Sequence, residues 1–346
     1  MWKTKWIILL ILATSFVGLV GCSQKTSTEK ELEKKIVELE KQLDLEREAK
    51  EAALNEIEEL EKEAEKIEEE KPVVVTVIDP NTKEVLKTFN PSELGYGTDM
   101  ETYKKEIGKW AREAARGTET APGYDQRMIP DKVDANGHII KGKPRVILEE
   151  AELLEKVINA SIKGGTVELP LYVTESGYKP EEVPQLGEVV VATYETHFDS
   201  SVAGRTKNIE LSAQAINNVL LGVGDVFSFN TTVGPSDAEH GYQKAMEAVN
   251  GKLVEGIGGG ICQTSSTLFN AVDQIGVKYV EKHHHSVNVG YVPKGRDATV
   301  SYGGLDFRFE NTSGVPLLIK AYTNKGTLTV ELRTSKVNQG LIIVVN

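Results

Sequence analysis

The 346-residue chain contains few cysteines and no excess of positive charge, and each absence excludes a class of protein. Two cysteines are too few for a small disulfide-stapled scaffold. At roughly 100 to 200 residues per domain, the length allows two compact domains with additional segments. The 52 acidic residues exceed the 40 basic ones, giving a formal charge of −12. Because a nucleic-acid binder needs a basic face, we expect no nucleic-acid partner.

Long apolar runs are also scarce, and the clear one lies at the start of the chain. Lys3 and Lys5 precede apolar residues 7–20, a run too short to span a membrane comfortably and typical of an export signal. It ends in Leu-Val-Gly-Cys at positions 19–22, which resembles the lipobox of bacterial lipoproteins. We therefore expect a signal peptide over residues 1–21, lipidation of Cys22 and an extracytoplasmic, membrane-anchored chain facing the cell wall. An ordinary secretory signal with an incidental cysteine is the alternative.

A charged, periodic segment follows at residues 29–71, with 18 acidic and nine basic residues. Its apolar residues alternate between steps of three and four, a heptad pattern that predicts a coiled-coil stalk of about 60 Å. Glu46 and Lys50 interrupt the apolar seam, and a single solvated helix is the alternative. The stalk is expected to end at Pro72 and to make the protein a possible coiled-coil oligomer. The seam comprises Leu32, Ile36, Leu39, Leu43, Ala53, Ile57, Leu60, Ala64 and Ile67.

Beyond residue 72 the composition changes to short strands and amphipathic helices, which predicts an α+β fold in two domains. The first, over residues 72–187, is expected to have strands at 73–78, 85–89 and 166–173, helices at 100–116 and 149–161, and a linker at 180–184. In the second, over residues 188–346, we expect a helix at 208–220 and a majority of strands. Those strands are expected at 189–194, 226–229, 277–281, 298–302, 305–310, 316–322 and 327–332.

Cys262 is the residue that most asks for a chemical explanation. If Cys22 is lipidated, Cys262 is the only thiol left and an intrachain disulfide is impossible. It follows a run of glycines and precedes a Thr/Ser-rich segment that reads as a helix start. A cysteine there experiences the positive end of the helix dipole, which lowers its pKa, and the N–H groups can hold an oxyanion. We therefore predict a nucleophilic thiol, with Gly260 and Gln263 shaping an oxyanion hole.

Three consecutive histidines at 283–285 supply candidate bases about 20 residues later in the chain. If the segment is extended, His283 and His285 share one face and His284 points the other way. A zinc site built from Cys262, His283 and His285 is an alternative, although it lacks a clear fourth ligand. An inert buried cysteine and a purely structural histidine cluster are the remaining alternatives.

A long, ordered set of motifs makes residues 193–334 resemble the VanW domain. The family usually carries His-x-His-Ser with proline in the middle, where this chain has His284, so the resemblance transfers roles to His283 and His285 only. Residues 72–187 are similar, more loosely, to the peptidoglycan-binding domain that often precedes VanW. The VanW motifs are Val226-Phe227-Ser228-Phe229-Asn230, Val233-Gly234-Pro235, Gly241-Tyr242, Asn250-Gly251-Lys252-Leu253-Val254, Gly258-Gly259-Gly260-Ile261-Cys262-Gln263, His283-His284-His285-Ser286 and Gly295-Arg296-Asp297-Ala298-Thr299-Val300.

This resemblance implies a reaction, because some VanW proteins with this domain order are understood as L,D-transpeptidases. It implies that the Cys262 thiolate attacks the third residue of a peptidoglycan stem tetrapeptide, releasing D-Ala and leaving a thioester. His285, or less favourably His283, would move the proton, and an amine of a second stem would resolve the thioester. Water as the acceptor would make the same site an L,D-carboxypeptidase. We expect no cofactor, since no phosphate loop, nucleotide fingerprint or metal motif is visible.

Further side chains receive supporting roles. Asp297 is expected to orient the histidine or to pair with Arg296. Arg205, Arg296 and Tyr302 are expected to meet the carboxylates of the substrate. The alternative to an enzyme is a non-catalytic peptidoglycan-binding lipoprotein, acting as a wall scaffold or glycopeptide-resistance accessory, in which Cys262 is inert.

Overall fold

The computed structural model describes residues 27–69, 72–249 and 252–343, and the chain divides into two units, residues 1–72 and 73–346. The expected signal peptide over residues 1–21, the lipidated Cys22 and residues 70–71 of the expected stalk lie outside the described residues. The described residues form a long N-terminal helix, followed by shorter helices and strand-rich sheets. The predicted α+β class is therefore confirmed.

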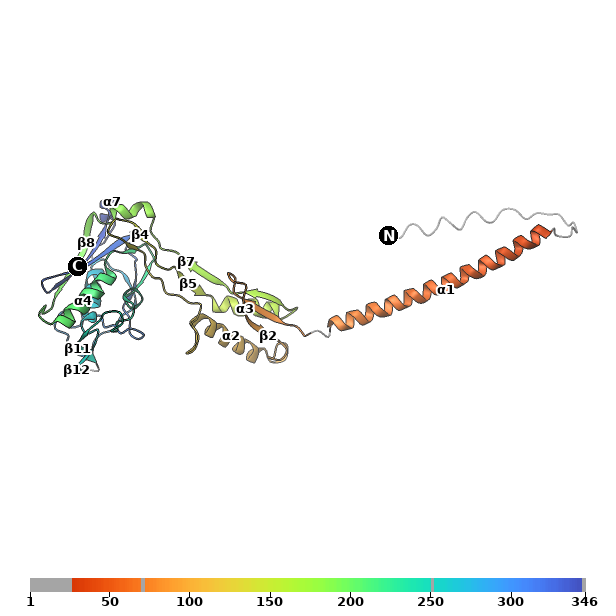
Figure 1. Cartoon of the computed structure of the whole chain (residues 1–346), viewed down its shortest axis with the longest axis horizontal. Helices are drawn as coiled ribbons and strands as arrows, with labels where there is room; N and C mark the ends of the chain where they lie inside the picture. The colour runs from red at the N-terminus through yellow and green to blue at the C-terminus, as the bar shows by residue number, and fades with distance from the viewer. Residues whose placement is uncertain (1–26, 70–71, 250–251, 344–346) are drawn as a thin grey trace. The chain divides into compact units, whose positions relative to one another are not determined.

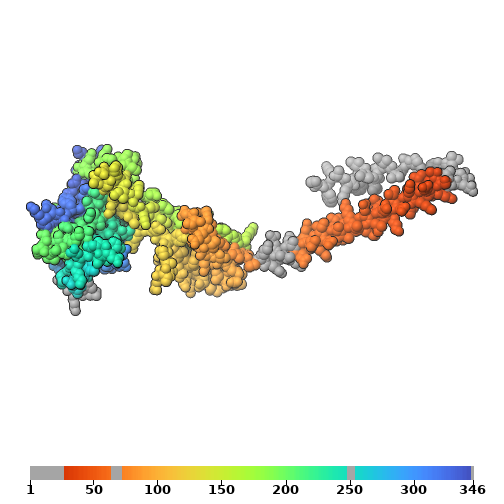
Figure 2. Space-filling model, viewed as in Figure 1, coloured from red at the N-terminus to blue at the C-terminus, as the bar shows by residue number. Residues whose placement is uncertain are grey.

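In the first unit, residues 27–69 form one uninterrupted helix, α1 (Ser27–Glu69), drawn in red to orange in Figures 1 and 2. Its charged side chains support the helix locally, as the Glu58–Lys62 ion pair one turn apart does at 3.0 Å. The apolar seam is exposed between Leu32 and Leu60, with Leu32 at 56% and Ile36 at 50% of their full accessible surface. Among the described helices, none combines the length and the apolar content that crossing a membrane requires.

The second unit begins with a three-stranded sheet in the order β2-β1-β6, covered by two helices. Asp99 caps the first helix by accepting a hydrogen bond from the Thr102 N–H at 3.0 Å. Buried apolar side chains of both helices pack on the strands around Tyr103, and this cluster is the core of the segment. The elements are β1 (Val75–Ile78), β2 (Val85–Phe89), α2 (Met100–Arg116), α3 (Glu150–Ala160) and β6 (Gly165–Glu168).

The strand expected at residues 166–173 is divided into two strands that belong to different sheets. β6 ends at Glu168, and β7 (Leu171–Thr174) pairs with β5 (Arg145–Leu148), which was not predicted. Pro170 lies between them, and because proline has no N–H it cannot continue a ladder of hydrogen bonds. The expected linker at 180–184 is instead a short 3₁₀ helix, η1 (Pro180–Gln185).

A six-stranded sheet in the order β4-β3-β9-β15-β16-β8 forms the centre of the unit. β3 pairs with β9 through Lys132 and Val219, so residues on both sides of the predicted domain boundary at 187 belong to one sheet. The strands are β3 (Lys132–Val133), β4 (Ile139–Ile140), β8 (Val189–His197), β9 (Val219–Leu221), β15 (Leu317–Asn324) and β16 (Thr327–Thr334).

Two helices, α4 (Ala203–Ile216) and α6 (Ile261–Asp273), pack on this sheet and against each other. The helix expected at 208–220 is α4, which begins and ends a few residues earlier in the chain than predicted. It ends early because Asn218 has a φ of 63°, a left-handed conformation that no helix continues through, and β9 starts at once. α6 carries Cys262, so it begins earlier than the Thr/Ser run alone indicated.

Of the remaining elements, α5, β11 and β12 contribute residues to the cavity at the N-terminal end of α6. Residues 298–302, expected as a strand, form a loop whose Thr299 N–H donates to the His283 carbonyl and whose Ser301 N–H donates to the Leu305 carbonyl. A hairpin of β11 and β12 was not predicted at all. The elements are β10 (Val226–Ser228), α5 (Phe229–Val233), β11 (Lys244–Val249), β12 (Lys252–Ile257), β13 (Lys278–Glu281), β14 (Arg308–Glu310) and α7 (Lys336–Gln339).

Phe307 provides a test of this core. Its ring is fully buried, 5.8 Å from the Phe269 ring on α6 and 5.5 Å from the Phe309 ring on β14. We expect Phe307→Ala to lower the free energy of unfolding by about 3–5 kcal/mol, because it leaves a cavity between helix and sheet. Urea unfolding measures this, with Val337→Ala as the control, since Val337 is 83% exposed. A loss at Phe307 no larger than that of the control would contradict the described core.

Candidate active site

Three glycines determine how α6 begins. Gly260 precedes the helix with a φ of 115°, a conformation that L side chains rarely adopt. A Cβ on Gly259 would come within 2.6 Å of the Met246 carbonyl oxygen on β11, and one on Gly260 within 3.1 Å of Ile209 on α4. The glycine run therefore lets the chain turn sharply into α6 while pressed between the hairpin and α4.

Cys262 lies in the first turn of α6 and is half-buried. Its Sγ is 3.4 Å from the Val300 carbonyl oxygen and 3.8 Å from Thr299 Oγ1. In the first turn of a helix, an N–H has no carbonyl four residues earlier within the helix, so the Cys262 N–H has no such acceptor inside α6. The predicted cysteine at a helix start is present.

His285 faces this region and is held by Asp297. The His285 side chain is almost fully buried, its Nδ1 is 2.7 Å from Asp297 Oδ2, and its backbone N–H donates to the same oxygen at 2.6 Å. With Nδ1 as the donor to the carboxylate, Nε2 is the nitrogen left for another group. Asp297 thus orients His285, which is one of the two roles expected of it.

The thiol and the imidazole influence each other's titration. Burial raises the pKa of the Cys262 thiol, but interactions with His285, a backbone hydrogen bond at Val300 and Thr299 outweigh it, so the pKa lies below its ordinary value. Burial lowers the pKa of His285, but Cys262 and Asp297 outweigh that effect and hold it above its ordinary value. Both shifts favour a thiolate paired with an imidazolium.

The other two histidines lie outside the cavity. β13 ends at Glu281, so the expected alternation along an extended segment does not apply to residues 283–285. His283 Nε2 is 3.1 Å from Glu281 Oε1, which directs it away from Cys262. His284, expected as a bystander, shares Asp297 with His285 at 3.0 Å from Oδ1 but remains half-exposed.

Gln263 holds Arg205 rather than offering a donor to an oxyanion. Its side-chain amide donates to Thr196 Oγ1 and to the His197 carbonyl, both at 3.0 Å, and its backbone N–H donates to the Gly260 carbonyl. Its Oε1 accepts from Arg205 Nη2 at 2.7 Å. Since all its N–H groups are engaged, Gln263 offers no free donor to an oxyanion, and its observed role is to hold Arg205.

Of the three residues predicted to contact the substrate, two line the cavity and one does not. Arg205 and Tyr302 line the cavity that contains Cys262. Arg296 does not, because its guanidinium donates to Asp273 at 2.6 Å and lies over the Phe269 ring, 4.9 Å from its centroid. Arg296 therefore ties the end of α6 to the following loop, and it pairs with Asp273 rather than with Asp297.

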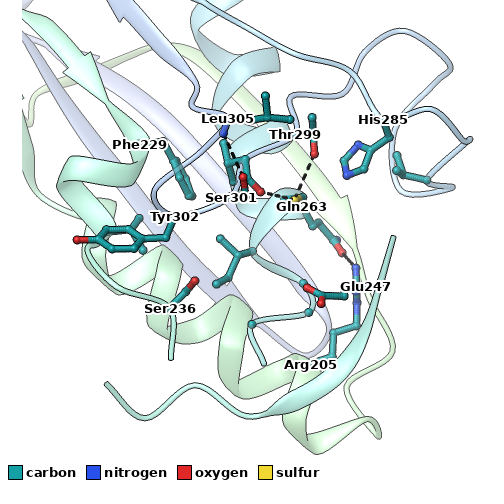
Figure 3. Close-up of a pocket in the computed structure, with 18 of the residues that line it drawn as sticks. Arg205, Phe229, Ser236, Glu247, Gln263, His285, Thr299, Ser301, Tyr302 and Leu305 are labelled. Atoms are coloured by element: carbon teal, nitrogen blue, oxygen red, sulfur yellow. Dashed lines mark hydrogen bonds between the residues drawn. The ribbon is translucent and has the colours of Figure 1, made fainter. Parts of the chain in front are cut away.

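The cavity itself has a volume of about 920 Å³ and is bounded by α4, α6, the β11–β12 hairpin and the loops after β13 (Figure 3). His285 and Thr299 lie toward one end of it in this view, while Arg205 and Glu247 lie toward another. Tyr302 and Ser236 lie on a third side. Ligand cavities of this size accommodate several amino-acid residues.

Glu247 and Tyr291 are among the cavity residues that escaped prediction. The Tyr291 hydroxyl is buried without a hydrogen-bond partner among the described residues, and the Arg205 guanidinium lies 5.9 Å from its ring centroid. Neither residue belongs to a motif with a chemical meaning, so no local signal identifies it. Only the folding of distant segments around α6 brings them to the site.

A zinc site was an alternative for this cluster. With His283 turned to Glu281, the described part of the chain contains no three His, Cys, Asp or Glu side chains arranged to hold a metal ion. The arrangement is that of a thiol, an imidazole and a carboxylate in series.

Comparison with known proteins identifies the region that contains the site. Residues 204–333 match the family described as VanW like protein. The chain is 39% identical over 219 residues to an uncharacterized protein, YoaR, of Bacillus subtilis (strain 168), covering 62% of this chain and 72% of that relative. The predicted resemblance to VanW is therefore confirmed.

A second relative is the vancomycin B-type resistance protein VanW of Enterococcus faecalis (strain ATCC 700802 / V583). It is 33% identical over 109 residues, which cover 30% of this chain and 40% of the relative. No solved structure matches the chain significantly.

The pKa shift of Cys262 predicts how the thiol reacts with iodoacetamide. We expect the rate of alkylation to rise with pH through a midpoint below 9.0, the ordinary thiol value, because the thiolate is stabilised. His285→Ala removes that stabilisation and should move the midpoint upward by about one pH unit or more. His283→Ala is the matched control, since His283 pairs with Glu281 outside the cavity. Equal midpoints in both variants would contradict the coupling.

Proposed function

The chain belongs to the VanW-like family, and from this premise we propose that it is a cysteine L,D-transpeptidase acting on peptidoglycan stem peptides. One observation carries the proposal. A thiol in the first turn of α6 lines the same cavity as His285, which is held through its Nδ1 by the buried Asp297. Nucleophile, base and orienting carboxylate in series are the arrangement that acyl transfer through a covalent intermediate requires.

In the first half-reaction, the Cys262 thiolate attacks the carbonyl carbon between the third residue and the terminal D-Ala of a stem tetrapeptide. Negative charge develops on the carbonyl oxygen, and the Cys262 N–H at the positive end of the α6 dipole is suited to stabilise it. The His285 imidazolium gives its proton to the departing D-Ala amine. This step leaves a thioester on Cys262 and a neutral imidazole.

In the second half-reaction, the side-chain amine of another stem's diamino acid attacks the thioester. Neutral His285 accepts the proton that this nitrogen loses, and the thiolate departs, which restores the starting pair. The product is a crosslink between the third residues of two stems. Where water attacks instead, the product is a shortened stem and the reaction is that of an L,D-carboxypeptidase.

Arg205 supports the choice of a substrate with a free terminal carboxylate. Its guanidinium is held in place by Gln263 and forms no ion pair with any carboxylate in the described part of the chain. Burial lowers the pKa of Arg205, which reflects the cost of keeping this charge away from water. A substrate carboxylate would offset that cost, and an Arg–carboxylate pair also fixes orientation. Tyr302, at the opposite side of the cavity in Figure 3, is positioned to contact the remainder of the stem.

Mass spectrometry of muropeptide products tests the reaction. Incubation of the full-length protein with disaccharide-tetrapeptides should release D-Ala and yield dimers that have lost one D-Ala. We expect Cys262→Ala to lower D-Ala release by at least about 10³-fold, since no nucleophile remains. D-Ala release without dimers would reassign the protein as a carboxypeptidase.

The same experiment separates the enzyme from the rival function. A non-catalytic wall-binding protein would bind the muropeptides and leave them unchanged, and the Cys262→Ala variant would behave identically. Retention of muropeptides by both proteins, without any product, would therefore favour the binding module over the transpeptidase.

The remainder of the chain supports a position at the cell wall. We propose that Cys22 carries a lipid anchor, that α1 acts as a spacer of about 65 Å, and that residues 72–187 bind peptidoglycan. The exposed apolar seam of α1 would then pair with a second helix as a coiled coil.

Cell fractionation tests the anchor. We expect the intact chain in the membrane fraction, and Cys22→Ser should move most of it out of that fraction, because the acyl chains attach through the thiol. Cys262→Ser is the matched control and should stay with the membrane. Membrane association of the Cys22→Ser variant equal to that of the intact chain would contradict lipid anchoring.

A further inference from the structure

The cavity contains a second charged group that the first half-reaction does not use. Glu247 on β11 lines it together with Cys262 and Arg205, and its carboxylate is half-buried. Figure 3 shows the Glu247 carboxylate directed into the space between the hairpin and α6. The cavity therefore presents one cationic and one anionic side chain besides the reacting groups.

The β11–β12 hairpin leaves room for the Glu247 carboxylate at Gly256. Gly256 lies on β12 opposite Ala245, two residues beyond Val254, the cross-strand partner of Glu247, and a Cβ there would approach Glu247 Oε1 to 1.9 Å. Any side chain at position 256 would displace the carboxylate from its present place. Because Gly256 has no left-handed φ, space for Glu247 is the steric reason that the structure offers for a glycine here.

Glu247 has no partner in the described part of the chain, neither an ion pair nor a side-chain hydrogen bond. Burial raises the pKa of Glu247, and no charged neighbour offsets the effect, Arg205 included. A carboxylate held partly out of water without a partner is unfavourable unless a ligand supplies the opposite charge. Among the side chains that the structure describes, none supplies a cation to Glu247.

We propose that Glu247 binds the ammonium group of the acceptor stem and removes its proton before the attack on the thioester. This inference rests on the function proposed above and names the residue that recognises the second substrate. The acceptor amine is the cationic group of that reaction, whereas the donor terminus is a carboxylate suited to Arg205. Opposite charges in one cavity would therefore give the donor carboxylate and the acceptor ammonium separate partners.

The proton balance is complete. The ammonium gives one proton to the Glu247 carboxylate, and the resulting amine attacks the thioester carbon, forming the amide as the carbon–sulfur bond breaks. The second proton goes from the nitrogen to His285, and the sulfur leaves as a thiolate. Glu247 then releases its proton to water. The amine of the D-Ala released in the first half-reaction takes up one proton from water.

The test measures how each protein divides the thioester between amine and water. The full-length protein is incubated with disaccharide-tetrapeptide and Nα-acetyl-lysine amide, a small probe with one primary ammonium group. Mass spectrometry gives the ratio of amine adduct to hydrolysed stem, which does not depend on the amount of active protein. We expect Glu247→Gln to lower this ratio by about tenfold or more, because the charge that attracts the ammonium is gone.

Glu255→Gln is the matched control. Glu255 lies on the same hairpin but is 64% exposed, pairs with Lys244 at 4.0 Å and does not line the cavity. Its replacement should leave the ratio unchanged. A Glu247→Gln ratio within twofold of the intact protein would overturn the inference.

Other outcomes are equally decisive. If the intact protein releases no D-Ala, the proposed function fails and this inference falls with it. If it releases D-Ala but never forms an adduct, the acceptor role of Glu247 alone is overturned. If Glu247→Gln forms no product of either kind, Glu247→Asp distinguishes the causes. Restored products with adduct would support the role of the charge, and continued inactivity would assign Glu247 to the donor step or the fold and overturn the inference.

Discussion

Hydrogen bonds from the buried polar face of α6 fix the nucleophile and the base relative to each other. Ser266 Oγ accepts the Ala298 N–H at 2.9 Å, and Asn270 Nδ2 donates to the Arg296 carbonyl at 2.7 Å. The loop segment 296–298 is thereby attached to the helix that begins with Cys262. Since Asp297 lies in that segment and holds His285, one helix positions all three groups. Unsatisfied polar groups inside the core would be costly, so these hydrogen bonds favour the observed arrangement of the loop.

The charged side chains in and near the cavity differ in whether the fold gives them a partner of opposite charge. Arg296 pairs with the Asp273 carboxylate and therefore does not face the site. Arg205 is held by the neutral side-chain amide of Gln263, so its charge remains for a ligand. Glu247 has no cation among the described residues. A cavity with one charge of each sign, neither neutralised by the other, suits substrates that carry both a carboxylate and an amine. Peptidoglycan stem peptides have this composition, which links the proposed function to the proposed role of Glu247.

Local features of the sequence predicted the elements whose stability is local. The helix at 100–116 was predicted to the residue, and the long helix at the N-terminus nearly so, because apolar periodicity extends over many turns. The failures share a different cause. The loop at 298–302 reads as a strand, but its backbone groups bond to distant segments, and the β11–β12 hairpin has no clean alternation of apolar residues. Its pairing depends on how it packs beside α6.

The sequence by itself determined the family, the α+β class and the pairing of a lone thiol at a glycine-rich helix start with a histidine cluster. These conclusions depend on the types and the spacing of residues that lie near one another in the sequence, so they can be drawn without knowledge of the tertiary structure. Which histidine faces the thiol, which arginine keeps its charge and whether Glu247 belongs to the site were decided by the tertiary structure. Each depends on contacts between segments tens of residues apart, such as Asp297 with His285 and Gln263 with Arg205, whose partners sequence spacing does not specify.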